Sequence, residues 1–250
     1  KLKKIFKLAK IYDAIYKNKN YQLEASSVNK ILSKNKKIKK ILELGSGTGQ
    51  HAKFLCNRGY SVQGIDSSKE MIANSLKIKN FKNNLGDIRY FNLNKKFDAA
   101  ISLFHVFSYL NSNKDVISTL INVNKHLKKN SYFIFDFWYL PAVLNLKPQK
   151  KNSIFQNFQY KINRKVIPKI SLNKNIVEVN YTFKVNDKKN RKKYIYKEKH
   201  SMRYFSINEI EIFCKFTGFE LINIRELNSN SKPSDKTWAV HAIIKKNKNI

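Results

Sequence analysis

Apolar and polar positions along residues 41–137 predict strands and helices in turn. Short apolar runs, typical of strands buried on both faces, are separated by segments with apolar residues every three or four positions. The predicted strands are 41–44, 61–66, a short one near Phe81 that ends at Gly86 and Asp87, 97–104 and 132–137, and the predicted helices are 51–57, 68–78 and 114–127. Five strands with helices between them predict a parallel, doubly wound sheet.

The pattern changes after Pro141. From about residue 150 to residue 205 the helical period disappears, and apolar residues at odd positions 177–185 alternate with polar ones, which is typical of a half-buried antiparallel strand. Residues 186–190 then form a polar turn and 193–205 a return strand. A helix over 206–216, with Ser206 as its N-cap and Gly218 past its end, precedes strands 220–227 and 237–244.

These elements predict an α/β fold with a doubly wound, seven-stranded Rossmann-like sheet and an antiparallel β insertion after the fifth strand. We expect residues 1–140 and 206–250 to form one domain, and residues 141–205 to form the insertion, which would serve substrate binding or oligomer contacts, with a homodimer as the candidate oligomer. Two helical segments, 4–17 and 21–32, precede the first strand and are expected to form a lid.

The cysteines and the apolar runs limit the class of protein. Cys56 and Cys214 lie far apart in apolar helical patterns, so we expect free, packed thiols and no disulfide or metal site. No apolar run reaches about 18 residues, and the basic first residues do not resemble a signal peptide. We therefore expect a cytoplasmic protein that does not contact the membrane.

The formal net charge of +33 would attract nucleic acid. Lysine supplies nearly all of it, and lysine, asparagine and isoleucine are abundant from end to end, which indicates a general composition bias. Dedicated nucleic-acid readers favour arginine and concentrate their charge in one stripe. The charge therefore leaves nucleic acid open as an alternative partner without demanding it.

Glycine is scarce but clustered. Of seven glycines, six fall between positions 45 and 86, and Gly45, Gly47 and Gly49 lie between a predicted strand and a predicted helix. Alternating glycines allow a sharp turn whose N–H groups come close to a ligand. Two ligands compete for it: with Asp66 the turn can be aligned with a dinucleotide fingerprint, but Glu43 before it would repel a pyrophosphate and accept from an ammonium group. A cofactor with a cation and a ribose fits better.

Four segments in this order resemble the motifs of class I S-adenosylmethionine (SAM)-dependent methyltransferases: residues 41–49, 64–71, 85–88 and 96–102. By that resemblance the turn holds the methionine portion and ribose, Asp66 accepts from the ribose hydroxyls, Met71 covers an adenine face, and Asp87 and Ile88 fix the adenine edge. The implied SAM-binding residues are Tyr21, Glu43, Gly45, Ser46, Gly47, Gly49, Asp66, Ser67, Met71, Asp87, Ile88 and Leu103. The implied product is S-adenosylhomocysteine (SAH).

The acceptor is expected at the end of the fourth strand, where His105 stands with Tyr109 one helical turn later. Methyl transfer depends mainly on alignment and exclusion of water, although an acceptor amine must be neutral and a hydroxyl benefits from a base. Residues 12–16, 102–110, 136–141 and 200–205 are similar to nucleotide-linked amino-sugar N,N-dimethyltransferases and to related enzymes of bacterial surface-polysaccharide clusters.

In that family a lid tyrosine and a residue after the fourth strand flank the amine, which implies Tyr16 and Tyr109 here. Some members have histidine in place of Tyr109, so His105, Tyr109 and Tyr16 all stay candidates for catalysis. The candidates for contacts with the substrate, which the resemblance implies is small and nucleotide-linked, are Tyr12, Trp138, Arg203 and Trp238.

The sequence therefore predicts SAM-dependent methylation of nitrogen, or alternatively oxygen, on a small soluble acceptor. An RNA-directed methyltransferase and a non-catalytic or dinucleotide-dependent protein remain alternatives. Against the RNA alternative, Ser102-Leu103-Phe104-His105 replaces the Asn-Pro-Pro-Tyr type of signature found in enzymes that methylate base amines, and no cysteine lies there to attack a pyrimidine.

Overall fold

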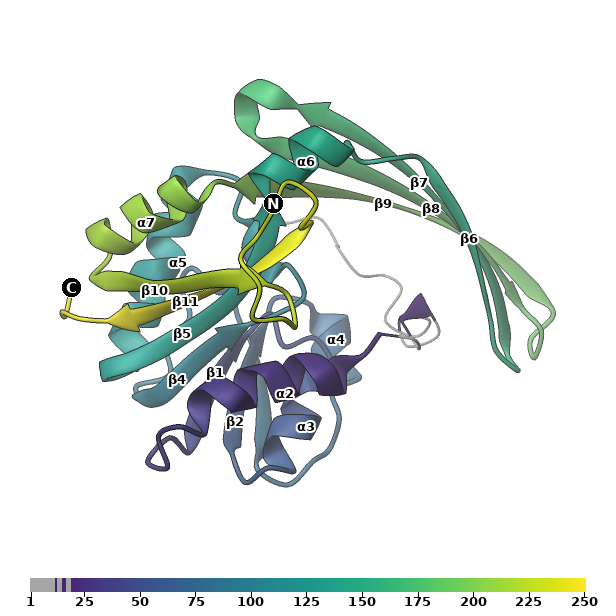
Figure 1. Ribbon diagram of the computed structural model, residues 1–250. Coiled ribbons are helices and arrows are strands. Elements are labelled where there is room, and N and C mark those ends of the chain that lie inside the picture. Colours follow the sequence, from purple (N-terminus) through teal and green to yellow (C-terminus); the bar gives the residue numbers. More distant parts are fainter. Residues whose placement is uncertain (1–11, 13–14, 17–18) are drawn as a thin grey trace.

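The central sheet has seven strands, as the sequence predicts. The computed structural model describes residues 19–250 together with Tyr12, Ile15 and Tyr16, so most of the predicted helix 4–17 lies outside the described residues. Five parallel strands run in the order β3-β2-β1-β4-β5: β1 (Lys40–Leu44), β2 (Ser61–Asp66), β3 (Phe81–Leu85), β4 (Phe97–Ser102) and β5 (Leu127–Tyr139). The sheet continues with β11 (Ala239–Lys246), antiparallel to β5, and β10 (Phe219–Glu226), antiparallel to β11 (Figure 1).

Helices cover both faces of this sheet, because its strands are apolar on both sides. They are α2 (Tyr21–Leu32), α3 (Gln50–Cys56), α4 (Lys69–Ala73), α5 (Asn113–His126) and α7 (Ile207–Phe216). Along β1, Leu42 and Leu44 belong to the core under α5 and α7, whereas Ile41 belongs to the core under α2 and α3. Ser206 caps α7 through a capping box with Glu209, which confirms the predicted helix start.

Two elements end earlier than the sequence predicts. The helix predicted over 68–78 stops at Ala73, and the backbone N–H of Leu76 instead donates to Thr48 O at 2.9 Å, which ties this segment to the glycine turn. The strand predicted over 97–104 ends at Ser102, because Phe104 and His105 both adopt left-handed backbone conformations. The local pattern of apolar residues contains no information on the hydrogen bond of Leu76 or on the backbone conformation at Phe104 and His105.

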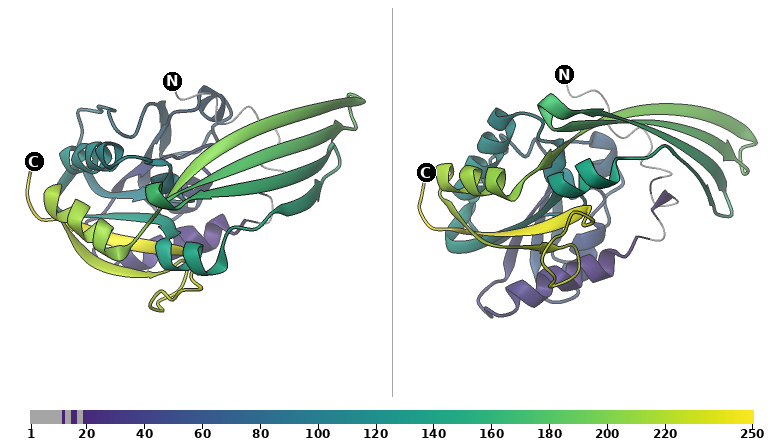
Figure 2. Two further views of the ribbon diagram at one scale, coloured as in Figure 1. Left: turned by 90° about the horizontal axis from the view of Figure 1, so that it is seen from above. Right: turned by 45° about the horizontal axis from the view of Figure 1, so that its top comes forward.

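The insertion is an antiparallel sheet of β6 (Lys151–Gln156), β7 (Tyr160–Ser171), β8 (Ile176–Asp187) and β9 (Lys192–Phe205). The sequence predicts β8 and β9 but not β6, β7 or the short helix α6 (Leu140–Leu146). The end of β9 pairs in parallel with the end of β5, Tyr204 opposite Trp138 and Phe205 opposite Tyr139. The long, arched insertion therefore continues the central sheet and projects away from it (Figure 2).

Both cysteines are buried and free. Within the described part of the chain, no helix is long and apolar enough to cross a membrane.

Candidate active site

A cavity of about 260 Å³ lies at the carboxyl ends of the parallel strands and is lined in part by Tyr181, His200 and Met202 of the insertion. Ligands bind at this edge in open α/β sheets. Fifteen of the residues predicted for a site line it: Tyr12, Tyr16, Tyr21, Gly45, Ser46, Gly47, Asp66, Ser67, Met71, Asp87, Ile88, Leu103, His105, Tyr109 and Trp138. The four that do not are Glu43, Gly49, Arg203 and Trp238.

The glycine turn has the backbone that its sequence requires. Gly45, Gly47 and Gly49 have φ angles of 67°, 55° and 91°, a region that residues with a β-carbon rarely adopt. A β-carbon at Gly45 would overlap the Val106 side chain, whereas one at Gly47 would meet no atom within 4 Å. The turn at Gly47 is thus an open cradle facing the cavity, and a cofactor fits there. Gly49 shapes the turn from outside the cavity, as the residue before α3.

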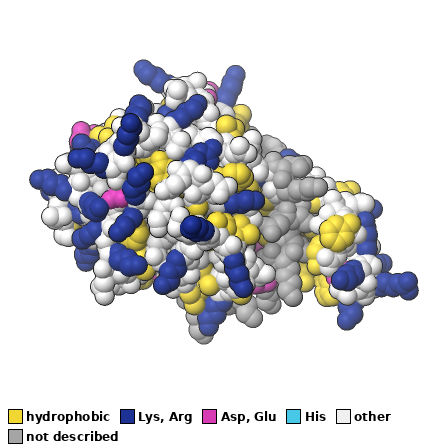
Figure 3. Space-filling view, turned by 90° about the horizontal axis from the view of Figure 1, so that it is seen from below, with side chains coloured by type: hydrophobic (Ala, Val, Ile, Leu, Met, Phe, Trp, Pro, Cys, Tyr) yellow, Lys and Arg dark blue, Asp and Glu magenta, His cyan; other side chains and the backbone are white. Residues whose placement is uncertain are grey.

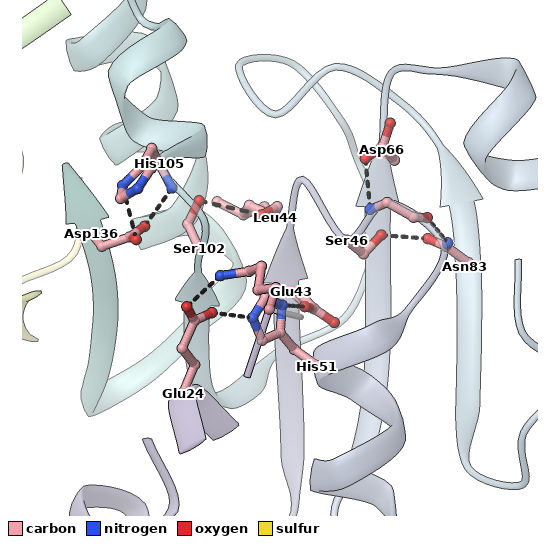
Figure 4. A network of polar contacts seen from close by, with 12 residues as sticks. Glu24, Glu43, Leu44, Ser46, His51, Asp66, Asn83, Ser102, His105 and Asp136 are labelled. Atoms are coloured by element: carbon pink, nitrogen blue, oxygen red, sulfur yellow. Dashed lines mark hydrogen bonds and ion pairs between the residues drawn. The ribbon is translucent and has the colours of Figure 1, made fainter. Parts of the chain in front are cut away.

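Asp66 lies at the end of β2 and faces this cradle (Figure 4). Its Oδ2 accepts from Gly47 N at 2.7 Å and its Oδ1 from Ser68 N at 2.8 Å. Burial raises the pKa of Asp66 despite these two hydrogen bonds. Each oxygen keeps a further lone pair, so this carboxylate can accept from two hydroxyls of a ribose.

The next carboxylate along the cavity, Asp87, is held by Arg89, which is not among the residues predicted for the site. Arg89 donates from its backbone N and Nε to Asp87 Oδ1, both at 2.9 Å, and from Nη2 to Oδ2 at 2.6 Å. Arg89 Nη1 also donates to Asp115 Oδ1 at 2.6 Å. Burial would raise the pKa of Asp87, but the hydrogen bonds and charge of Arg89 lower it. Asp87 is thus an ionised acceptor held in a fixed position.

A buried cluster of charged groups lies behind the glycine turn. His51 Nε2 is 2.6 Å from Glu24 Oε2, His51 Nδ1 is 3.6 Å from Glu43 Oε1, and Lys19 pairs with Glu24 (Figure 4). Burial would lower the pKa of His51, but its hydrogen bond to Glu24 and the negative charges of Glu43 and Glu24 raise it. Burial would raise the pKa of Glu24, yet His51 and Lys19 lower it.

Glu43 belongs to this cluster, and its predicted contact with the cofactor stays a prediction. Glu43 is only 1% exposed and stands behind His51, which lines the cavity in its place. The His51 imidazole, on α3, lies 3.6 Å from the Glu43 carboxylate, on β1. His51 is not among the residues predicted for the site, since nothing local marks the second residue of a helix as a partner of two distant carboxylates.

At the acceptor end of the cavity, a strained turn presents His105. Phe104 and His105 have φ angles of 66° and 62°, and the 3₁₀ helix η1 (Val106–Tyr109) follows. Asp136, on β5, accepts from His105 N at 2.8 Å through Oδ1, and its Oδ2 lies 3.1 Å from His105 Nδ1. Burial would raise the pKa of Asp136, but the charge and hydrogen bonds of His105 lower it. An ionised Asp136 thus holds both the backbone and the imidazole of His105.

Tyrosines surround the rest of the acceptor end. Tyr109 Oη is 2.6 Å from His200 Nδ1, and the His200 ring lies edge-on to Tyr181, both from the insertion. The Tyr16 ring is 4.5 Å from that of Tyr12 and 5.2 Å from that of Phe104, centroid to centroid. His200 and Tyr181 are not among the residues predicted for the site, because Tyr109 and His200 are 91 positions apart and no local pattern links them.

Two predicted substrate contacts lie outside this cavity. Arg203 is 7% exposed, donates to Glu209 Oε1 at 2.9 Å and lies over the ring of Phe205, so it fixes the start of α7 and is committed elsewhere. Trp238 packs edge-on against Trp138, with ring centroids 5.2 Å apart, and only Trp138 reaches the cavity. Arg203 is thus engaged outside the cavity, its predicted contact with the substrate stays a prediction, and Trp238 packs behind Trp138.

Comparison with known proteins places this site in a family. A protein-family model described as a methyltransferase domain matches residues 41–130, which include the glycine turn, Asp66, Asp87 and His105. An uncharacterized protein of Methanocaldococcus jannaschii is 30% identical over 92% of this chain and 80% of its own length. The dTDP-3-amino-3,4,6-trideoxy-alpha-D-glucopyranose N,N-dimethyltransferase of Streptomyces venezuelae is 26% identical over 53% of this chain, and the match spans 58% of that enzyme.

Solved structures share the whole fold. A SAM-dependent methyltransferase from Clostridium acetobutylicum superposes with a TM-score of 0.80 at 21% identity, covering 96% of this chain and 98% of its own. DesVI of Streptomyces venezuelae superposes with a TM-score of 0.78 at 19% identity, covering 94% of this chain and 97% of its own. The coverage includes the insertion, so the β extension belongs to the shared fold.

Proposed function

The chain belongs to the SAM-dependent methyltransferases, and we propose that it methylates the amine of a small, soluble, nucleotide-linked amino sugar. The observation that carries the proposal is a single cavity in which a cofactor cradle adjoins an end lined by tyrosines and histidines of both the core and the insertion. SAM, when bound, supplies the methyl group. The chain has to position the acceptor, exclude water and receive a proton.

The cofactor half of the cavity supports SAM. The open cradle at Gly47 can hold the methionine portion, and Asp66 can accept from the ribose hydroxyls. Buried Met71 can cover the adenine, and Asp87, ionised and fixed by Arg89, can accept from the adenine amine. The remaining expected cofactor contacts, Tyr21, Ser46, Ser67, Ile88 and Leu103, all line the same cavity.

The acceptor half supports an amine on a sugar. Tyr12, Tyr16 and Trp138 offer flat rings on which a pyranose can stack and π faces that attract an amine as it becomes cationic. Several relatives are named as N,N-dimethyltransferases of dTDP-linked amino sugars. The sequence also leaves three further proposals: methylation of oxygen instead of nitrogen, a role in polysaccharide biosynthesis, and a homodimer. The test below decides between nitrogen and oxygen.

The test supplies SAM and dTDP-3-amino-3,6-dideoxy-alpha-D-glucopyranose, the sugar in the name of one relative, and follows acceptor mass. We expect gains of one and then two methyl groups, and no gain on the analogue with hydroxyl in place of the amine. Methylation of that hydroxyl analogue, or of none among the dTDP-linked 3-amino and 4-amino sugars, would contradict the proposal.

Cofactor binding is tested separately, by calorimetry with SAH. Asp66→Ala removes two hydrogen bonds to a charged acceptor, each contributing about 1.5–3 kcal/mol, so we expect at least ~100-fold weaker binding. Asp235→Ala, at an exposed position outside the cavity, serves as the control and should bind SAH like the wild type. Equal affinity in Asp66→Ala would show that the ribose lies elsewhere.

A further inference from the structure

The insertion contributes a line of three polar side chains to the acceptor end of the cavity. Tyr109 Oη lies 2.6 Å from His200 Nδ1, and His200 Nε2 lies 3.1 Å from Glu198 Oε2. Tyr109 comes from η1 of the core, whereas His200 and Glu198 are both on β9. Tyr109 and His200 line the cavity, and the side chains of His200 and Glu198 are 9% and 7% exposed.

The hydrogen-bond donors and acceptors of these three side chains allow few arrangements of the hydrogens. An ionised carboxylate only accepts, so His200 Nε2 carries a hydrogen and donates it to Glu198. In a neutral imidazole Nδ1 is then an acceptor, and the Tyr109 hydroxyl has to donate to it. In an imidazolium Nδ1 donates instead, and the Tyr109 hydroxyl is free to donate to a group in the cavity. Both states satisfy every hydrogen bond in the line.

The two states differ by one proton, which is what an amine acceptor has to release. We propose that Tyr109, His200 and Glu198 form a proton relay by which the insertion takes the proton from the methylated amine, an inference that rests on the proposed function. As the acceptor N–H bond breaks, its electron pair stays on nitrogen and its proton bonds to Tyr109 Oη. The original hydroxyl proton passes to His200 Nδ1, so the tyrosine stays neutral and the imidazolium lies beside Glu198.

Tyr109 cannot be the final proton acceptor or the base on its own. Burial raises the pKa of its phenol well above the ordinary value, with Tyr181, Tyr16 and Glu198 adding to the rise, so the hydroxyl stays protonated at neutral pH. A phenol in that state passes a proton only when a base receives one from it at the same time. His200 is the base in contact with it.

The other groups around the relay do not replace it. Tyr181 packs its ring edge-on against His200, with centroids 5.0 Å apart, and Tyr16, Arg164 and Glu198 are close enough to shift the pKa of Tyr181. Burial raises the pKa of Tyr181 to about 12, so it too stays neutral. In this arrangement Tyr109 is the catalytic residue that touches the acceptor, and His200 and Glu198 act through it as positioning residues.

The first test needs no acceptor. Imidazole ¹⁵N spectra of the full chain saturated with SAH resolve five histidines, and His200→Asn assigns the signal of His200. We expect the Nε2–H tautomer near neutral pH, and in Tyr109→Phe an Nδ1 signal moved toward that of an acceptor nitrogen without a hydrogen bond. A hydrogen on Nδ1 of neutral His200, or an unchanged Nδ1 signal in Tyr109→Phe, would overturn the relay even if the enzyme methylates amines.

The second test measures turnover with the dTDP-linked 3-amino sugar. His200→Asn keeps a polar side chain of similar size but no base, so we expect kcat to fall about 100-fold, the low end for general-base catalysis, with SAH affinity unchanged. Free imidazole should restore part of the rate in His200→Ala. The control is Lys199→Ala, because Lys199 is exposed and pairs with Glu178 on the opposite face of the strand.

The two outcomes separate the two proposals. An unchanged kcat in His200→Asn, or no effect of imidazole on a slowed His200→Ala, would overturn the relay while leaving the methyltransferase activity in place. A wild-type enzyme that methylates no amino sugar would contradict the proposed acceptor, and the ¹⁵N spectra would then still decide whether the hydrogen-bonded line exists.

Discussion

At the scale of single residues, the acceptor end depends on strained backbone. Phe104 and His105 are consecutive residues with positive φ angles, and neither is glycine. Such conformations each cost about 1–3 kcal/mol and persist only where the surroundings fix them. The buried Asp136 carboxylate does this, because it accepts from His105 N and lies 3.1 Å from His105 Nδ1. The left-handed backbone at these two residues ends β4 and places His105 at the cavity.

His105 itself is the residue whose loss should separate binding from turnover. We expect His105→Ala to lower kcat by about 100-fold, since the imidazole aligns the acceptor with the methyl group, and to leave SAH affinity unchanged. The measurement is turnover with a dTDP-linked amino sugar beside calorimetry with SAH. Unchanged turnover would show that the acceptor binds at another part of the cavity.

At the scale of elements, α2 is fastened to the glycine turn through charge. Glu24 on α2 pairs with His51 on α3, and His51 touches Glu43 on β1. Lys19, just before α2, adds a second cation to Glu24 and lies 3.9 Å from the centre of the Phe104 ring. One buried cluster therefore connects the end of the lid, the cofactor turn and the acceptor turn.

The pKa shifts of this pair predict how its contribution to stability depends on pH. The pKa of His51 is raised in the folded chain. The stability that protonated His51 contributes is therefore complete at pH values below its ordinary pKa, near 6.5, and is lost as pH rises through the raised pKa. The pKa of Glu24 is lowered in the folded chain. The stability that ionised Glu24 contributes is therefore present at pH values above its ordinary pKa, about 4.3, and is lost as pH falls through the lowered pKa. We expect Glu24→Gln to reduce the free energy of unfolding by roughly 1.5–3 kcal/mol near pH 6, and by less near pH 9.

Urea unfolding of the ligand-free chain at the two pH values measures this difference. Glu220→Gln, at an exposed position on β10, is the control and should cost little at either pH. An equal loss of stability in Glu24→Gln at both pH values would show that the charge of His51 contributes nothing.

At the scale of the whole molecule, the basic residues behind the net charge of +33 occur along the whole sequence. On the one face shown in Figure 3, lysine and arginine side chains are scattered over the described part of the surface, with few acidic ones between them. A field of this kind attracts polyanions without reading them.

RNA as the acceptor makes a different prediction from a small sugar. We expect SAM labelled in its methyl group to label the dTDP-linked amino sugar and not total tRNA at about 150 mM salt. We also expect turnover on the sugar to change far less than the ~10³–10⁵-fold loss of affinity that six to ten phosphate contacts give between about 50 and 200 mM salt. Labelled tRNA at a comparable rate would favour the RNA alternative.

Much of the cofactor half could be predicted because its requirements are local. A left-handed backbone favours glycine, so Gly45, Gly47 and Gly49 are visible in the sequence, and Asp66 ends the short segment 61–66 that the sequence predicts as a strand. Arg89 was within reach too, since it follows Asp87 by two residues. The positions of Glu43 and Arg203 could not be predicted. Glu43 lies next to His51 and Arg203 pairs with Glu209, and no local sequence pattern indicates either contact.

The sequence by itself determined the succession of strands and helices in the central sheet and the presence of an antiparallel insertion, because the period of apolar residues is a property of neighbouring positions. It also determined the class of cofactor, through the resemblance of four local motifs to those of SAM-dependent methyltransferases. Only the tertiary structure decided how the acceptor end is built. His200 reaches Tyr109 because β9 pairs with the end of β5, and Asp136 reaches His105 because β4 and β5 are neighbours. These contacts join residues tens of positions apart, and such contacts leave no periodic signal in the chain.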